Sequence, residues 1–129
     1  PLKDDSEAMM PRSLPLAVLL TMALAAPAAW SDDKVDFATQ IQPIFTANCV
    51  VCHSPGGIGS FMNLTAGSAF ASLVQSTSPR VIAGNSANSV LYGRIIGTIT
   101  PQMPLGGTPL SAANQTLIKN WIDQGAANN

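Results

Sequence analysis

The feature that most constrains this chain is the pentapeptide Cys49–Val50–Val51–Cys52–His53. The 129 residues contain only two cysteines and one histidine, and all three stand within this stretch. Two thiols separated by two residues, with an imidazole directly after the second, put three reactive groups on one short piece of backbone. We therefore expect these three residues to carry the chemistry of the protein.

The spacing Cys-x-x-Cys-His is typical of covalent attachment of a c-type haem. The two thiols can add to the two vinyl groups of the porphyrin, and the adjacent histidine then faces the iron and ligates it. We therefore interpret Cys49 and Cys52 as the attachment points of one haem c per chain, and His53 as an axial ligand of its iron. A group attached in this way becomes a permanent part of the core.

A Cys-x-x-Cys pair could have three other uses. A thioredoxin-like redox pair needs a β-α-β pattern, and no segment shows the two-residue alternation of a strand. A zinc site needs a second pair of Cys or His ligands, which the sequence lacks. A structural disulfide between Cys49 and Cys52 would be permitted in an oxidising compartment. The adjacent His53 and the export signal described next favour haem attachment.

The first thirty residues contain an apolar run that is typical of an export signal. Residues 1–8 are acidic, which does not suit the positive head of a signal, so we take them as lying upstream of the natural start or as added to it. Residues 9–28 have Arg12 in the head, an apolar stretch and a small-x-small cleavage site at Ala26–Pro27–Ala28. The apolar stretch is shorter than the roughly 20 residues of a membrane span. We expect cleavage with no lasting membrane anchor, a periplasmic protein, and a mature domain of residues 29–129.

Composition narrows the functions that this domain can have. The chain is 47% hydrophobic and 10% charged, which argues against disorder. A net charge of −1 gives no basic patch, so we expect no nucleic-acid partner. No Ser/His/Asp set and no paired carboxylates suggest hydrolysis, because His53 is already committed, so a hydrolase is not expected.

Short helices joined by long loops are expected in the mature domain. An apolar stripe covers residues 35–45, with Pro43 either breaking the helix or beginning its second part. In the last helix, Ser111 is the expected N-cap and Gly125 the expected stop. The four expected helical segments are residues 35–45, 66–75, 86–96 (with Asn85 or Ser86 as cap) and 111–125. Loops rich in Pro and Gly are expected at residues 55–59 and 100–109.

A second axial ligand can be sought by elimination. His53 is the only histidine, so one chain cannot supply two-histidine ligation. After removal of the signal, Met62 and Met103 remain. Met103 stands between Pro101 and Pro104, which restrict the backbone around it, whereas the neighbours of Met62 look like core filling, a common role of methionine. We favour Met103 as the axial ligand of the iron.

Two arginines are candidates for the anionic propionates of the haem. Arg80 and Arg94 could donate hydrogen bonds to these carboxylates, and Tyr92 could contribute a hydroxyl. The alternative is that all of them are solvated surface groups, and the sequence does not decide between these interpretations.

From about Val35 to Ala126 the chain resembles a class I c-type cytochrome, and most closely the small Planctomycete-type cytochrome c domain. The matching pieces are Ile41–Gln42–Pro43–Ile44–Phe45, the Cys49–His53 motif, the segment 84–95, Met103–Pro104 and Trp121–Ile122–Asp123–Gln124–Gly125–Ala126. The resemblance implies an all-α cytochrome c fold, with short helices and long loops wrapped around one covalently bound haem. It also implies that the first and last helices cross, with packing roles for Phe45 and Trp121. The glycine-rich stretch 56–59 departs from the pattern.

The function expected from these features is single-electron transfer in the periplasm by a monohaem cytochrome. Both axial positions would be filled by His53 and Met103, so the iron would change oxidation state without binding substrate. The alternative is a haem-based gas sensor or small-molecule binding protein in which the Met ligand is displaced. We expect an electron-transfer protein, not an enzyme, although it could be a domain or partner of an oxidoreductase complex. The expected partners are redox proteins, including periplasmic or membrane-bound oxidoreductases.

Overall fold

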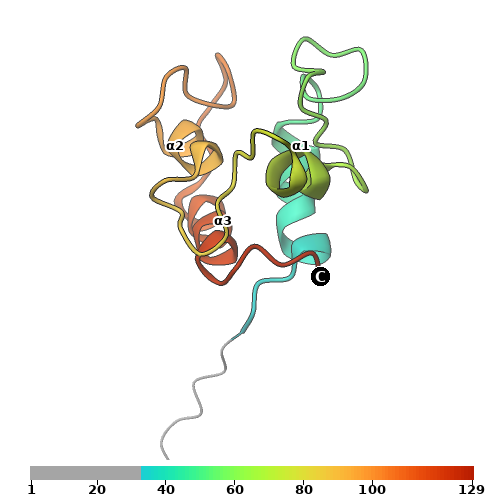
Figure 1. The fold of residues 1–129 in the computed structure, drawn as a ribbon. Helices are drawn as coiled ribbons and strands as arrows, with labels where there is room; N and C mark the ends of the chain where they lie inside the picture. The colour runs from blue at the N-terminus through green and yellow to red at the C-terminus, as the bar shows by residue number, and fades with distance from the viewer. Residues whose placement is uncertain (1–32) are drawn as a thin grey trace, which may run out of the picture. The chain divides into compact units, whose positions relative to one another are not determined.

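The computed structural model describes residues 33–129. The predicted upstream residues 1–8 and the predicted signal, residues 9–28, lie outside the described residues. The described part is made of helices and loops and contains no strand (Figure 1). The predicted all-α class is confirmed. In chain order the elements are η1 (Phe37–Ile41), α1 (Gln42–Asn48), η2 (Ala71–Gln75), α2 (Val90–Ile96) and α3 (Ala112–Asp123).

The first helical stretch begins as a π-helix, η1, and continues directly as α1. Asp36 caps η1, because its Oδ1 accepts a hydrogen bond of 2.8 Å from the Thr39 backbone N–H. Pro43 lies in the first turn of α1. Its missing N–H would have no helical partner there, so proline does not interrupt the helix. Pro43 therefore begins the second part of this helical stretch, which was one of its two predicted roles.

The two middle helices are shorter than predicted. Of the expected segment 66–75, residues 69 and 70 are α-helical and Ala71–Gln75 form η2, and α2 begins at Val90, not near residue 86. The physical reason for the late start of α2 is local competition by polar side chains. Asn85 Oδ1 accepts from the Asn88 N–H, and Ser89 Oγ donates to the Asn85 carbonyl at 2.8 Å. These bonds hold the backbone in turns, so the predicted caps Asn85 and Ser86 do not start a helix.

The last helix, α3, matches its prediction. The Ser111 hydroxyl accepts a hydrogen bond of 3.2 Å from the Asn114 N–H. Gly125 follows the helix with φ of +110°, a conformation that favours glycine. The inward face carries Ile118, Trp121 and Ile122, which are all buried.

An aromatic cluster holds the early and late parts of the chain together. The Phe37 ring lies 5.1 Å from the Trp121 ring and 6.3 Å from the Phe45 ring, centroid to centroid. Phe45 and Trp121 are almost completely buried, as the resemblance implied for their packing. Phe37 lies against both of them, so η1 and α3 are in contact. Asn129 adds hydrogen bonds from its carbonyl to the Ala38 N–H and from its side chain to the Phe37 N–H.

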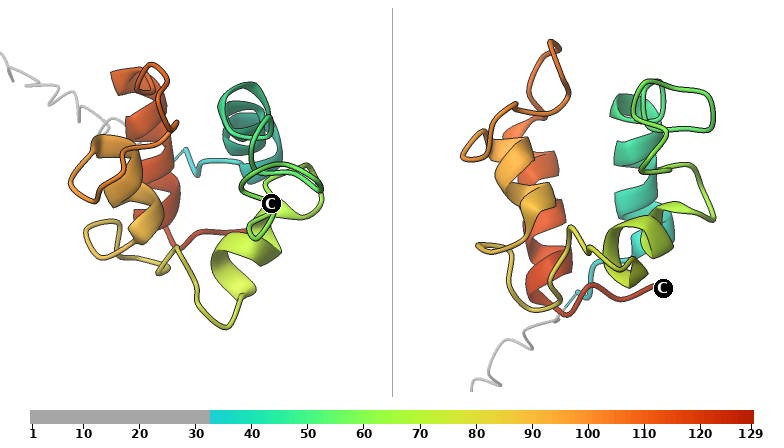
Figure 2. Two further views of the ribbon diagram at one scale, coloured as in Figure 1. Left: turned by 90° about the horizontal axis from the view of Figure 1, so that it is seen from above. Right: turned by 45° about the horizontal axis from the view of Figure 1, so that its top comes forward.

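The described residues form two lobes (Figures 1 and 2). We call the lobe with η1, α1, η2 and the loop after α1 the first lobe, and the lobe with α2, α3 and the loop between them the second lobe. Among the helices that the structure describes, none is long and apolar enough to cross a membrane.

Candidate functional site

A cleft of about 560 Å³ lies between the two lobes. Its size is within the range of about 300–1,000 Å³ that small-molecule and cofactor sites occupy. The lining is mostly apolar and includes Leu64, Leu91 and Leu110. The cleft is also lined by five of the six predicted site residues: Cys49, His53, Arg80, Arg94 and Met103. The sixth, Cys52, lines a hollow of about 150 Å³ that shares Cys49, His53 and Met103 with the cleft.

The Cys-x-x-Cys-His motif lies where α1 ends. The Cys49 N–H donates to the Phe45 carbonyl at 2.8 Å and so continues the helical pattern by one residue. The His53 N–H then donates to the Cys49 carbonyl at 2.9 Å, which closes the motif into a turn. Because this turn is tied to α1, Cys49 and His53 come to the wall of the cleft, and Cys52 comes to the hollow that shares these two residues with it.

The His53 ring is held by the backbone of Gly59. Its Nδ1 lies 3.1 Å from the Gly59 carbonyl oxygen. A carbonyl can only accept, so Nδ1 carries the hydrogen, and Nε2 is left with its lone pair for a ligand. A Cβ on Gly59 would lie 2.4 Å from Nδ1, so no side chain fits at this position. Sequence reasoning missed this role. The only sequence signal for this role of Gly59 was that the glycine-rich stretch 56–59 departs from the family pattern.

Met103 reaches the cleft from the second lobe through a loop that is fastened to α2. The helix ends at Gly97, whose φ is +82°. The chain then turns back, and the Gln102 side chain donates from Nε2 to the Ile95 carbonyl at 3.0 Å. The Met103 N–H donates to the Arg94 carbonyl at 2.9 Å. These two bonds fix the loop against the end of the helix, so the Met103 thioether is positioned at the cleft.

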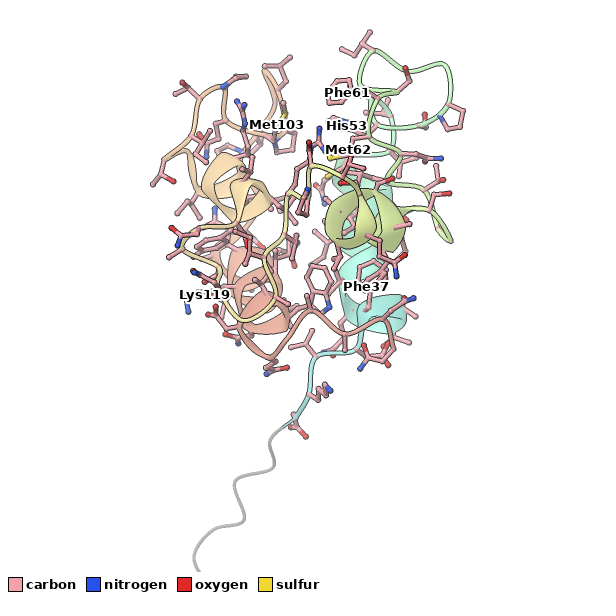
Figure 3. All side chains as sticks on the ribbon, in the orientation of Figure 1. Phe37, His53, Phe61, Met62, Met103 and Lys119 are labelled. Carbon is pink, nitrogen blue, oxygen red and sulfur yellow. The ribbon has the colours of Figure 1, made fainter. Side chains whose placement is uncertain are left out.

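The two methionines of the mature domain lie on different walls. Met62 also lines the cleft, while packing in part against the hydrophobic core. Figure 3 shows His53 and Met62 together on the first lobe and Met103 on the second lobe across from them. Of the two methionines, only Met103 could therefore supply a second ligand from the wall that faces His53.

Both candidate arginines line the cleft and are held by backbone carbonyls. Arg80 donates from Nη1 to the Ser78 carbonyl at 3.1 Å, and Arg94 donates from Nη1 to the Pro101 carbonyl at 3.2 Å. No carboxylate stands among the cleft residues of the described chain. The cleft is therefore an apolar space with two positive charges at its walls, a combination that suits an apolar ligand with anionic groups.

Phe61 is a second cleft residue that sequence reasoning missed. Its ring makes an edge contact with the His53 ring, with 5.9 Å between the centroids. The Arg80 guanidinium lies over the Phe61 ring, 5.9 Å from its centroid. No local sequence pattern signals this arrangement, because it joins three residues from two separate loops.

The two thiols are free in the structure. Burial, and to a smaller extent the neighbouring Cys52, raises the pKa of the Cys49 thiol to about 11. The reactive cysteine of a thiol–disulfide enzyme needs a lowered pKa, so Cys49 does not have that character. In the part of the chain that the structure describes, no group of three or more His, Cys, Asp or Glu residues converges to hold a metal ion.

These features fit a haem attached through the motif. His53 offers one free nitrogen, Met103 offers a thioether from the opposite wall, and the thiols stand beside the histidine. The apolar lining suits a macrocycle and the two arginines suit its propionates.

Comparisons with known proteins show a likeness at the level of structure. No model of a known protein family matches the chain, and no curated protein matches it. The solved structure of Kuenenia stuttgartiensis hydrazine synthase is similar, with a TM-score of 0.55 and 25% sequence identity. The likeness covers 71% of this chain and 16% of the hydrazine synthase chain. This chain is thus similar to one small part of a much longer protein.

Proposed function

We propose that residues 29–129 form a c-type cytochrome domain that transfers single electrons. Cys49 and Cys52 attach one haem c, and His53 and Met103 bind its iron. The observation that carries this proposal is the meeting of His53 and Met103, from opposite lobes, at one apolar cleft beside the two thiols. The resemblance to class I c-type cytochromes and the likeness to part of hydrazine synthase support it.

When bound, the haem supplies a one-electron couple at its iron, and the chain tunes that couple. Gly59 fixes the ring and the tautomer of His53 through its carbonyl, which orients Nε2 and raises its basicity. Met103 supplies a soft, neutral thioether, which favours the reduced state. The apolar walls of the cleft would limit contact of the haem with water, and Arg80 and Arg94 would neutralise its anionic propionates.

We further propose that the domain acts as an electron carrier and not as a catalyst. If His53 and Met103 both held the iron, no position there would be open to a substrate. The likeness to 16% of a longer enzyme supports a role as a domain or a partner of an oxidoreductase. The export signal in the sequence supports maturation in the periplasm, with redox proteins as partners.

The experiment that tests this proposal is maturation in a bacterium that attaches haem c in its periplasm. Mass spectrometry of the purified protein should show one added haem, and acid-acetone should extract none. The reduced protein should not bind carbon monoxide. A variant with Cys49→Ala and Cys52→Ala should carry no covalent haem. Extractable haem in the native protein would contradict the proposal, and free binding of carbon monoxide would favour the gas-sensor alternative.

A further inference from the structure

The loop that carries Met103 also closes the end of α2. The last carbonyls of a helix have no partner inside the helix and need one outside it. Successive carbonyls near the end of α2 find theirs in this loop: those of Gly93, Arg94 and Ile95 accept from the Ile99 N–H, the Met103 N–H and the Gln102 side chain. A Cβ on Gly93 would stand 2.6 Å from the Ile99 side chain, so the loop packs directly on the helix. A group that holds this loop therefore also holds the Met103 thioether.

One of the bonds between helix and loop comes from a charged side chain. Arg94 donates from Nη1 to the Pro101 carbonyl at 3.2 Å. Its own carbonyl accepts from the Met103 N–H at 2.9 Å. Pro101, Met103 and Arg94 all line the cleft. Arg94 is thus bonded to the loop at two points, one on either side of Gln102.

Arg80 lines the same cleft but is held in a different way. Its Nη1 donates to the Ser78 carbonyl at 3.1 Å, which belongs to its own segment of the chain. Its guanidinium lies over the Phe61 ring of the first lobe. Among the described residues, no side-chain hydrogen bond joins Arg80 to the loop of Met103. The two arginines carry the same charge at the same cleft, and of the two only Arg94 is bonded to this loop.

We propose that Arg94 is a positioning residue for Met103, because its guanidinium holds the Pro101 carbonyl and so fixes the loop that presents the thioether. This inference rests on the proposed function, in which Met103 binds the iron. A guanidinium has several N–H donors in a planar fork, so the bond to Pro101 leaves donors of Arg94 for a propionate. One side chain would then join two contacts of the haem, a propionate and the axial methionine.

The test compares Arg94→Lys with Arg80→Lys in the haem-loaded chain, because both substitutions keep the positive charge. An ammonium lacks the fork and cannot hold Pro101 and a propionate in the same geometry. Arg94→Lys should therefore weaken the sulfur-to-iron absorption band of the oxidised protein and increase carbon monoxide binding by the reduced protein. Amide hydrogen exchange in residues 98–105 should become about fivefold faster, as expected for the loss of one hydrogen bond. Arg80→Lys disturbs the other propionate contact and can shift the potential, but exchange in this loop should keep its wild-type rate.

A second variant tests the fastening of the loop without touching a charge. Gln102→Leu removes the hydrogen bond to the Ile95 carbonyl and keeps Arg94. It should speed exchange in residues 98–105 and weaken the same absorption band. Exchange in α3 serves as the measure of global stability and should stay at the wild-type rate in all three variants.

Three outcomes would overturn the inference. Arg94→Lys could behave like Arg80→Lys, which would leave Arg94 with its charge alone. Arg94→Lys could speed exchange in α3 as much as in the loop, which would indicate a general structural role. The loop could exchange faster while the absorption band and the carbon monoxide binding stay unchanged, which would show that the position of Met103 does not depend on this bond.

The same measurements separate this inference from the proposed function. A wild type with attached haem that does not bind carbon monoxide, together with an unaffected Arg94→Lys variant, would leave the proposed function intact and remove only the role of Arg94. A wild-type chain without attached haem, or one that binds carbon monoxide freely, would contradict the proposed function itself.

Discussion

The Gly59 carbonyl oxygen lies 3.1 Å from Nδ1 of His53, and Gly59 lies so close to the ring that a Cβ would stand 2.4 Å from the same nitrogen. One residue therefore both orients the imidazole and leaves room for it. Its backbone does not need the left-handed conformation, so the requirement for glycine at this position is a matter of space.

We expect Gly59→Ala to destabilise the protein and to disturb the His53–iron bond. Overpacking of a tight contact costs about 1–3 kcal/mol, and displacement of the ring weakens the bond to Gly59. The measurements are the free energy of unfolding in denaturant and the visible spectrum of the haem-loaded protein. Gly107→Ala is the control, because a Cβ there meets its nearest neighbour at 3.4 Å. Equal effects of the two substitutions would refute the special role of Gly59.

The second prediction concerns the two cleft methionines. Met103→Ala should keep the attached haem, because the thioether bonds to Cys49 and Cys52 do not depend on it. It should open the iron to carbon monoxide, remove the weak sulfur-to-iron absorption band of the oxidised protein and lower the midpoint potential. Met62→Ala should do none of these and should only lose packing, up to about 2 kcal/mol for a half-buried side chain. If only the Met62 variant bound carbon monoxide, Met62 and not Met103 would be the ligand of the iron.

The third prediction tests the charges at the cleft. Arg80→Gln and Arg94→Gln should each lower the midpoint potential, because a positive charge near the haem favours the reduced form. The decrease in midpoint potential should correspond to about 1 kcal/mol per electron, because partial exposure screens the charge. Lys119→Gln should leave the potential unchanged, since Lys119 is paired with Asp123 away from the cleft. Voltammetry at low salt measures the midpoint potentials of all three variants. Unchanged potentials in both arginine variants would indicate that Arg80 and Arg94 are solvated surface groups.

The fourth prediction concerns the pH dependence of stability. The hydrogen bond from Lys119, with further help from the Ser86 N–H, holds the pKa of Asp123 below its usual value of 3.8. A lowered folded-state pKa adds stability above the unfolded pKa, and this stability is lost as the pH falls through the folded pKa. Asp123→Asn should therefore destabilise the protein at neutral pH by less than about 1 kcal/mol, because the pair is partly exposed. Thermal unfolding at several pH values should show this difference shrinking below about pH 4; a difference that stays constant would contradict the argument.

Features of the fold and site that depend on residues close together in the sequence could be predicted. Features that depend on contacts between distant residues were missed. The all-α class and the cap and stop of α3 followed from local signals at Ser111 and Gly125. Cys49, His53 and Met103 could be singled out because cysteine and histidine are rare in this chain and two prolines stand close to Met103. The start of α2 was wrong because Ser89 bonds to backbone groups outside the helix. Gly59 and Phe61 were missed because their roles arise only when the loop after α1 folds back on His53.

The bonds between Asn129 and the segment Val35–Ala38 have a consequence for the way the domain can be joined to others. Both ends of the described fold lie at the aromatic cluster, where Phe37 meets Trp121. Domains whose ends lie close together are readily inserted into longer chains. Here the polypeptide would enter and leave at one corner, while the cleft residues Phe61 and Met103 lie at the other end of the molecule (Figure 3). A covalently linked neighbour can thus be added at the base without covering the loops that carry Phe61 and Met103.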